Sequence, residues 1–359
     1  MTIRCLALGV LLWAIAPVAQ AQLMLVDSGG DRVMLFDPND GSVLDENWLT
    51  DINAQGWAFT TPKEATIVDG EIWVADQIED AVHRFDPERN FLSSIETGPN
   101  GAPLDNIRSL GFDGQTVYVV NAAGQIGNAV VTYDAGGNNT GSFAVNGSCF
   151  DAEAFEGDVL VTNSTTHAVQ RYRNGQFLED FAVDLDFAEQ LVVLPDGTVL
   201  VANAIAPAGE RGLYHYEPDG ELITFVDVQS IGNPVVRGGY LLGNGSYLVS
   251  SGGGIYTAEP DGQGGYIFTK VSDADGQYVT TLSTGCGERA RLKARCKQGG
   301  EKVVGKLKRA EPNTAVTFRL DGGNPQGAQT NNDGKAKTRW KNQQPGPHEV
   351  TVCDLSAEC

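Results

Sequence analysis

The sequence predicts an all-β protein, namely a six-bladed β-propeller followed by a small C-terminal β-sandwich that is stapled by disulfides. Three observations lead to this fold class. A strand-rich segment recurs six times at a spacing of 40 to 49 residues. The chain of 359 residues contains 44 glycines and 15 prolines, which indicates many tight turns. After residue 286 the composition changes from strongly acidic to basic.

Each repeat contains a strand that ends in Asp, Asn or Ser, followed by another strand and a turn that is often rich in Asp, Pro and Gly. A repeat of this length, with about four strands per unit, is typical of propeller blades, whereas the coils of a β-solenoid are shorter. The six marked strands end at Asp27, Asp76, Asn121, Asn163, Asn203 and Ser251.

The two ends of the repeat array predict how the ring closes. The first unit begins directly at its second strand, with no strand before Leu23. After the sixth unit, residues 277–283 (QYVTTLS) form one further strand. We expect this strand to complete the first blade, because an open ring would leave unpaired strand edges.

The repeats resemble the NHL-type propellers, whose blades follow the pattern P-E-x-hydrophobic-x-V-x-x-G-x-hydrophobic-Y-V-A-D. The match is clearest from Pro62 to Asp76 and from Ala188 to Asn203, and it covers most of 23–285. The resemblance implies a six-bladed propeller of the TolB-like or gluconolactonase-like kind. It implies no single activity, because such propellers include lyases, lactonases and binding proteins.

Residues 1–21 have the features of a secretory signal peptide. Arg4 is followed by an apolar stretch over residues 6–16, and Ala19-Gln20-Ala21 forms a small-x-small cleavage site. No later stretch approaches the roughly 20 apolar residues of a membrane-spanning helix. We expect a mature chain that starts near Gln22, has no transmembrane segment and is secreted or periplasmic.

The net charge of −21 is unevenly distributed along the chain. Residues 22–286 contain 10 basic and 38 acidic side chains, whereas residues 287–359 contain 14 basic and 8 acidic ones. The acidity of the propeller argues against a nucleic-acid partner, because phosphates would be repelled. For the basic C-terminal region this exclusion does not hold.

The composition places the propeller at residues 22–285 and a separate basic domain at residues 286–359. Segments such as RLKARCK, KVVGKLKR and HEVTVC predict short strands with one apolar face. The run from Val316 to Cys353 resembles the Ig-like modules of exported bacterial proteins, with a T-N-x-x-G turn followed by P-G-x-H-x-V-T-V. Its basic strands could bind an acidic surface, either an acidic polymer or the propeller itself, or could simply be solvated.

Export places the cysteines in an oxidising compartment. Four of the five cysteines of the mature chain follow residue 285. One pairing joins Cys296 to Cys353 and Cys286 to Cys359, although four cysteines allow three connectivities. Cys149 is then left over, and we expect it to be a small buried residue.

Ligands of propellers bind at the mouth of the central channel, where the innermost strands begin. Aligning the repeats on their Gly turns places a charged residue at the matching position of five blades, with Tyr278 or Gln277 in the sixth. Charged side chains are rarely buried unpaired. They therefore either pair with one another or bind a ligand, with Arg108 and Arg237 holding a carboxylate or phosphate. The five are Glu64, Arg108, Asp151, Glu189 and Arg237.

A divalent cation is the alternative occupant of this mouth. Similarity to gluconolactonase-type lactonases implies a cation held by Glu, Asn and Asp. Glu64, Asp151 and Glu189, with Asn163 or Asn203 nearby, could supply oxygen ligands to Ca²⁺. The two arginines in the same ring disfavour a cation, so no cofactor is our first expectation.

Two hypotheses about function follow. The first is a module that binds a small molecule, peptide or protein at the mouth without catalysis. The alternative is a divalent-metal-dependent lactonase, other hydrolase or lyase that uses the same mouth, with His167 as a weak candidate for an acid or base. Motifs for a Ser-His-Asp triad, a zinc HExxH site, a Walker loop or a dinucleotide fold are absent from the sequence. The sequence leaves both function classes open.

Overall fold

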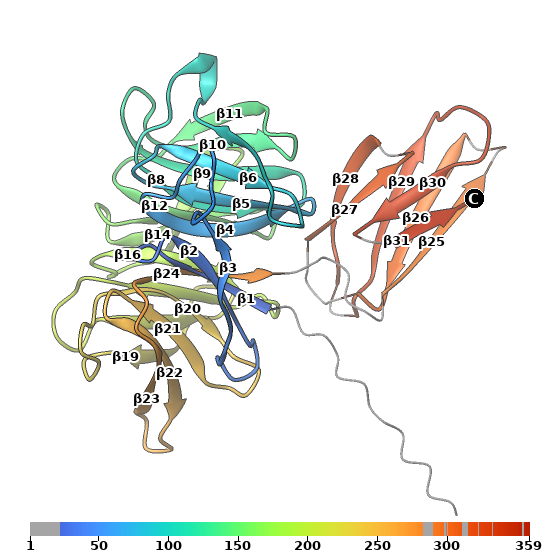
Figure 1. Ribbon diagram of the computed structural model, residues 1–359. Helices are drawn as coiled ribbons and strands as arrows, with labels where there is room; N and C mark the ends of the chain where they lie inside the picture. Colours follow the sequence, from blue (N-terminus) through green and yellow to red (C-terminus); the bar gives the residue numbers. More distant parts are fainter. Residues whose placement is uncertain are drawn as a thin grey trace, which may run out of the picture.

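The computed structural model describes residues 22–282, 290–297, 299, 301–310, 315–321, 323–331, 333–353 and 355–359. The predicted signal peptide and Cys286 lie outside these residues. The described chain is an all-β protein in which a six-bladed propeller is followed by a β-sandwich (Figure 1). No helix among the described residues has the length and hydrophobicity needed to cross a membrane.

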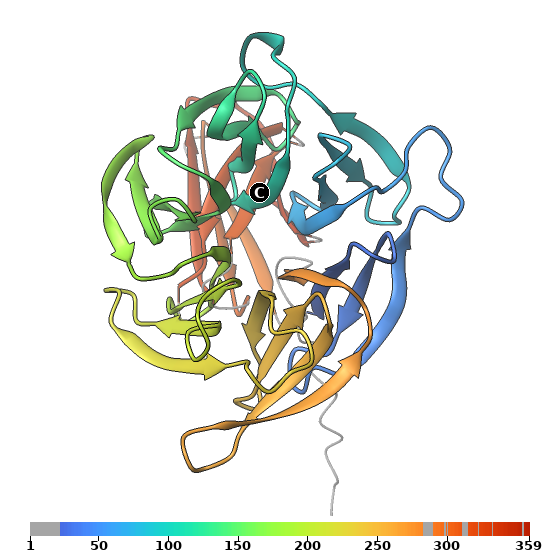
Figure 2. The same ribbon diagram turned by 90° about the vertical axis from the view of Figure 1, so that its left-hand side faces the viewer.

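Six four-stranded antiparallel sheets surround a central axis, as Figure 2 shows. Blades two to six each use four consecutive strands, of which the first is the innermost. These strands are β4 (Pro62–Val68), β5 (Glu71–Asp76), β6 (Ala81–Phe85) and β7 (Phe91–Ile95); β8 (Ile107–Phe112), β9 (Thr116–Ala123), β10 (Gly127–Asp134) and β11 (Asn139–Ala144); β12 (Cys149–Phe155), β13 (Asp158–Asn163), β14 (Ala168–Arg173) and β15 (Gln176–Ala182); β16 (Ala188–Val193), β17 (Val199–Asn203), β18 (Gly212–Tyr216) and β19 (Leu222–Asp227); β20 (Val236–Leu241), β21 (Tyr247–Ser251), β22 (Gly254–Pro260) and β23 (Tyr266–Ser272).

The first blade confirms the predicted closure of the ring. Its innermost strand is β24 (Gly276–Leu282), which comes from the end of the propeller and pairs with β1 (Gln22–Asp27). The blade continues with β2 (Arg32–Phe36) and β3 (Val43–Thr50). Both ends of the propeller are therefore held in one sheet, which removes the open edges that an unclosed ring would have.

The propeller core lies between neighbouring blades. Trp73 of β5 and Leu110 of β8 belong to a buried cluster between blades two and three, and Leu160 of β13 and Leu191 of β16 belong to one between blades four and five. Alternating residues of each strand point to opposite faces of its sheet, so both faces of each blade are packed. Burial of this kind is the main favourable term in folding.

The residues that end the second strands connect loops. Asn121 accepts a hydrogen bond from the Asp105 amide at 2.7 Å and donates to the carbonyls of Ala123 and Gly127. Asp76 accepts from the amides of Thr60 and Thr61. The repeated Asp or Asn thus joins the loop before an inner strand to the loop after the second strand.

The C-terminal sandwich consists of two sheets with a core that includes Phe318 and Trp340. One sheet has three strands, β25 (Arg291–Lys297), β26 (Lys302–Lys308) and β29 (Ala336–Lys341). The other has the order β28 (Gly323–Gln329), β27 (Ala315–Leu320), β30 (Glu349–Val352) and β31 (Leu355–Glu358).

The four-stranded sheet supplies contacts with the propeller. Arg319 of β27 forms an ion pair with Asp69 in the β4–β5 turn. Gly327 of β28 lies against Gly114 and Gln115 in the β8–β9 turn. Both turns follow the ends of inner strands, so the sandwich contacts the propeller face opposite to the one where the inner strands begin.

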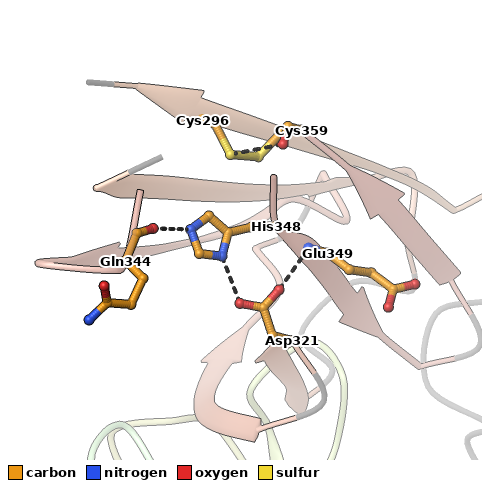
Figure 3. The surroundings of a disulfide bond; sticks show 6 residues. All are labelled: Cys296, Asp321, Gln344, His348, Glu349 and Cys359. Carbon is orange, nitrogen blue, oxygen red and sulfur yellow. Dashed lines mark hydrogen bonds and ion pairs between the residues drawn. A yellow bond between two sulfur atoms is a disulfide. The ribbon is translucent and has the colours of Figure 1, made fainter. Parts of the chain in front are cut away.

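The observed disulfide differs from the predicted pairing. Cys296 of β25 is bonded to Cys359, with the two Cα atoms 5.3 Å apart, and not to Cys353 (Figure 3). The reason is topological, because Cys359 follows β31 directly, whereas Cys353 occupies the turn between β30 and β31. Cys353 is itself disulfide-bonded. Nearby, His348 contacts Asp321 at 2.6 Å and the Gln344 carbonyl at 2.9 Å.

Candidate functional site at the propeller mouth

All six inner strands contain a β-bulge at the same position near their beginning. At each bulge, two consecutive residues of the inner strand face one residue of the second strand. A bulge leaves an extra residue outside the ladder and redirects its side chain. The six pairs are Lys63–Glu64, Arg108–Ser109, Phe150–Asp151, Glu189–Gln190, Arg237–Gly238 and Gln277–Tyr278.

The bulges correct the alignment that the sequence suggested. The predicted ring placed Glu64 and Asp151 at the same level as Arg108, Glu189 and Arg237, but the structure divides these residues between two levels. We call the first members of the pairs the bulge ring and the second members the second ring. The bulge ring consists of Lys63, Arg108, Phe150, Glu189, Arg237 and Gln277, and the second ring consists of Glu64, Ser109, Asp151, Gln190, Gly238 and Tyr278.

Contacts within the bulge ring join neighbouring blades in pairs. The Lys63 ammonium donates to Gln277 Oε1 at 2.8 Å. Arg237 and Glu189 form an ion pair at 3.0 Å. The bulge ring therefore contains one ion pair, Arg237 with Glu189, and this pair alone does not neutralise its charged side chains.

Arg108 makes no contact with a carboxylate among the described residues. Its guanidinium donates to Ser148 Oγ at 2.8 Å and to the Cys149 carbonyl at 2.9 Å. The same group lies over the Phe150 ring, 3.9 Å from the ring centroid. Neutral acceptors and an aromatic face thus hold this cation in place.

The bulge ring is electrostatically positive, since Lys63, Arg108 and Arg237 face a single carboxylate, Glu189. Burial lowers the pKa of Lys63 to about 8, although Glu189 acts in the opposite direction. Burial also lowers the pKa of Arg108 and raises that of Glu189. The Nε atoms of Arg108 and Arg237 are buried and have no hydrogen-bond partner among the described residues.

The second ring is acidic where the bulge ring is basic. Glu64 and Asp151 are fully buried, and each accepts a hydrogen bond from an amide of the next inner strand, Leu110 at 2.7 Å and Leu191 at 2.8 Å. Tyr278 is 1% exposed, and burial raises the pKa of its hydroxyl. The buried Gln190 accepts from the Gly239 amide in the same manner.

Three carboxyl groups lie together in this acidic layer. Oxygen atoms of Glu64, Asp151 and Glu153 all lie within 4.8 Å of one another. Burial is the main cause that raises the pKa of each group, to about 7 for Asp151, and Asp151 raises the pKa of the other two further. The sequence suggested Glu64, Asp151 and Glu189 as metal ligands. In the structure, Glu153 takes the place of Glu189 in this group.

The asparagines considered as metal ligands already have other hydrogen bonds. Asn163 Oδ1 accepts from the amides of Thr165 and Thr166, and Asn203 Oδ1 accepts from the Phe187 amide at 2.8 Å. By contrast, the hydroxyl oxygen of Ser109 in the second ring is buried and has no hydrogen-bond partner among the described residues.

The weak catalytic candidate His167 lies in the β13–β14 turn. Its Nδ1 is 2.9 Å from the Asp186 carbonyl, and its side chain is 55% exposed. His167 contacts the loop residues Leu185 and Asp186 on the mouth face, and among the described residues it contacts neither ring. Cys149 is a buried free thiol, as expected, and burial raises its pKa to about 11.

Four residues of this site were not predicted from the sequence, namely Lys63, Phe150, Glu153 and Ser109. The signal that could have found the first two is the bulge itself, since each inner strand begins with two consecutive residues that could occupy the mouth. Glu153 follows Asp151 by two positions, so both side chains leave the same side of β12. That spacing indicated that a second carboxyl lies below the first.

Comparisons with known proteins support the fold. No protein-family model and no curated protein sequence matches the chain. Among solved structures, a protein of unknown function from Bacteroides caccae is similar over 74% of this chain and 100% of its own, with a TM-score of 0.52 and 16% identity.

Two further solved structures have lower TM-scores. Virginiamycin B lyase from Staphylococcus aureus has a TM-score of 0.46 at 10% identity, over 82% of this chain and 92% of the lyase. The extracellular domain of a proposed one-component system from B. thetaiotaomicron has a TM-score of 0.46 at 11% identity, over 94% of this chain and 54% of that one. The sheet order of this chain shows the all-β propeller fold, and these likenesses carry no conclusion about an activity.

Proposed function

We propose that this protein is an exported binding protein that recognises an anionic group at the propeller mouth without catalysis. The observation that supports this most strongly is the charge of the bulge ring, in which three cations face one carboxylate. A carboxylate or phosphate of a small molecule or peptide would complete this ring. Such groups form strong charge-assisted hydrogen bonds with guanidinium ions.

The unpaired guanidinium atoms support the same proposal. A buried donor without a partner costs about 1–3 kcal/mol of stability. The Nε atoms of Arg108 and Arg237 both have this property within the described residues. An anion bound between the blades would supply acceptors for them, whereas a cation would be repelled by both arginines.

Isothermal titration with citrate and inorganic phosphate, and with neutral glucose as the control solute, tests the proposal. We expect the double variant Arg108→Gln/Arg237→Gln to lose at least tenfold in affinity for the anions, which corresponds to about 1.4 kcal/mol. Lys270→Gln, which removes an exposed propeller cation, is the matched control and should bind normally. Equal binding by all three proteins, or binding of glucose alone, would contradict the proposal.

The carboxyl cluster supports a second candidate, a divalent-metal site that could serve a lactonase, other hydrolase or lyase. Glu64, Asp151 and Glu153 are oxygen donors of the kind that Ca²⁺ prefers, and Glu64 Oε1 is buried without a hydrogen-bond partner among the described residues. A bound cation would act there as a Lewis acid. The residues present therefore fit a hard cation.

Thermal unfolding with and without Ca²⁺ tests this candidate. Because the pKa of Asp151 is raised from its usual value to about 7, its ionisation destabilises the metal-free fold as pH rises toward 7. Ca²⁺ should therefore raise Tm more at pH 8 than at pH 5 in the wild type. Glu153→Gln should abolish the difference, and an unchanged wild-type Tm at both pH values would exclude the metal site.

The proposal also includes export of the protein and the boundaries of its domains. We infer that residues 1–21 direct secretion or transport to the periplasm, that residues 22–285 are an NHL-type propeller, and that residues 286–359 are an Ig-like domain. The disulfide between Cys296 and Cys359 supports an oxidising destination. Mass spectrometry of the secreted protein, with an N-terminus at Gln22 expected, checks the first of these limits.

A further inference from the structure

The three-stranded sheet of the sandwich has one face that is almost entirely cationic. Cross-strand register places Lys293, Lys306 and Lys337 opposite one another in one row. A second row contains Lys297, Lys302 and Lys341. The remaining cations of this basic face are Arg291, Arg295, Lys308 and Arg339.

Burial shows that these side chains point away from the core. In β25 and β29 the basic residues are exposed, and the residues between them are buried or half-buried. Val303 and Leu307 of β26 belong to the sandwich core, so Lys302 and Lys306 lie on the opposite face. No acidic residue occurs in any of the three strands.

The three lysines of the first row have no ion-pair partner among the described residues. Like charges directly opposite one another on a sheet are destabilising. None of the ion pairs formed between described residues involves Lys293, Lys306 or Lys337. A polyanion laid across the rows would relieve this repulsion and release its own counterions.

The acidic propeller of the same chain does not cover this face. Among the described residues, Arg319 and Gly327 contact the propeller, and both belong to the other sheet of the sandwich. Because the two sheets of a sandwich pack through their inner faces, the basic face points outward from the opposite side.

The composition of the face selects among classes of polyanion. Single-stranded nucleic acids are bound by aromatic side chains that stack on bases, and membrane surfaces by apolar side chains that insert. The outward residues of these strands include no aromatic residue, and Val304 is the only large apolar one, at 6% exposure. The face offers regularly spaced cations, roughly 5 Å apart across strands and roughly 7 Å along them.

From these observations we infer that the β25–β26–β29 face binds a linear anionic polysaccharide through its rows of lysine and arginine. This role is independent of the anion site at the propeller mouth, which lies on another part of the molecule. Binding would hold the exported protein on an acidic glycan and leave the mouth open to its ligand.

Affinity measurements on the full mature chain test the inference, with heparin and polygalacturonate as sulfated and carboxylated probes. The row variant Lys293→Gln/Lys306→Gln/Lys337→Gln should bind at least tenfold more weakly at about 50 mM salt, with a smaller salt dependence. The control Arg89→Gln/Arg173→Gln/Lys270→Gln removes three exposed cations of the propeller and should change affinity less than about threefold. Unfolding curves should show that the row variant folds at least as stably as wild type.

Several outcomes would overturn the inference. Equal loss in the row variant and the control would show that only net charge matters. Tighter binding to duplex DNA, or to phosphatidylglycerol vesicles, than to either polysaccharide would assign the face to another partner. Binding that does not weaken with salt would rule out the electrostatic basis. Because the mouth variant Arg108→Gln/Arg237→Gln should bind polysaccharide normally, failure of one proposal can be distinguished from failure of the other.

Discussion

At the scale of single residues, the mouth separates two kinds of charge. The bulge residue of each inner strand belongs to a basic layer, and the residue after it belongs to an acidic layer. Lys63 and Glu64 are adjacent in sequence, yet one lies among arginines and the other among carboxyl groups. This arrangement keeps the second-ring acids from neutralising the two arginines of the bulge ring. Of these two, Arg237 forms an ion pair with a carboxylate, and Arg108 forms none among the described residues.

Lys63 makes the mouth sensitive to pH. Its pKa of about 8 means that it loses its proton as pH rises through 8, so the bulge ring loses one of three positive charges. The affinity for citrate should therefore fall by about tenfold between pH 7 and pH 9.5, equivalent to about 1.4 kcal/mol. Calorimetric titrations across this range provide the measurement. Lys63→Gln should bind more weakly at pH 7 and show no such fall, and a wild-type affinity that is constant with pH would contradict the assignment.

At the scale of elements, the strand β24 joins the end of the propeller to its beginning. Leu25 of β1 pairs with Val279 of β24, and both are completely buried. Leu25→Ala would leave a cavity at this junction and should cost about 2–5 kcal/mol in the free energy of unfolding. Chemical denaturation measures this loss. Leu44→Ala, at a residue 47% exposed, serves as the comparison and should cost less than about 1 kcal/mol.

The elements were largely predictable from the sequence, whereas the site was predictable only in part. The second strands, the closing strand and the number of blades follow from periodicity and from turn residues, which are local signals. The ring at the mouth depends on bulges, and a bulge shifts register by one residue without a mark in the local pattern. The predicted ring therefore mixed Glu64 with Arg108, although both residues are at the mouth. The disulfide pairing likewise depends on which strands become neighbours, and Cys296 meets Cys359.

At the scale of the whole molecule, the net charge of −21 is the sum of an acidic propeller and a basic sandwich. The acidic propeller presents a small positive ring at one face, and the sandwich contacts the opposite face through Asp69 and Arg319. The mouth therefore stays clear of the sandwich. The basic face of β25, β26 and β29 points outward, so a ligand at the mouth and a polysaccharide on the sandwich could be bound at the same time.

The anomalous scattering of a selenate-soaked crystal tests the central claim most directly, because selenate mimics sulfate and phosphate and its position is observed. We predict a selenium peak inside the bulge ring, with selenate oxygens about 3 Å from guanidinium nitrogens of Arg108 or Arg237. The peak should disappear in Arg108→Gln/Arg237→Gln. A ring without a peak, in crystals where selenate occupies the lysines of the sandwich, would contradict the claim that the mouth binds anions.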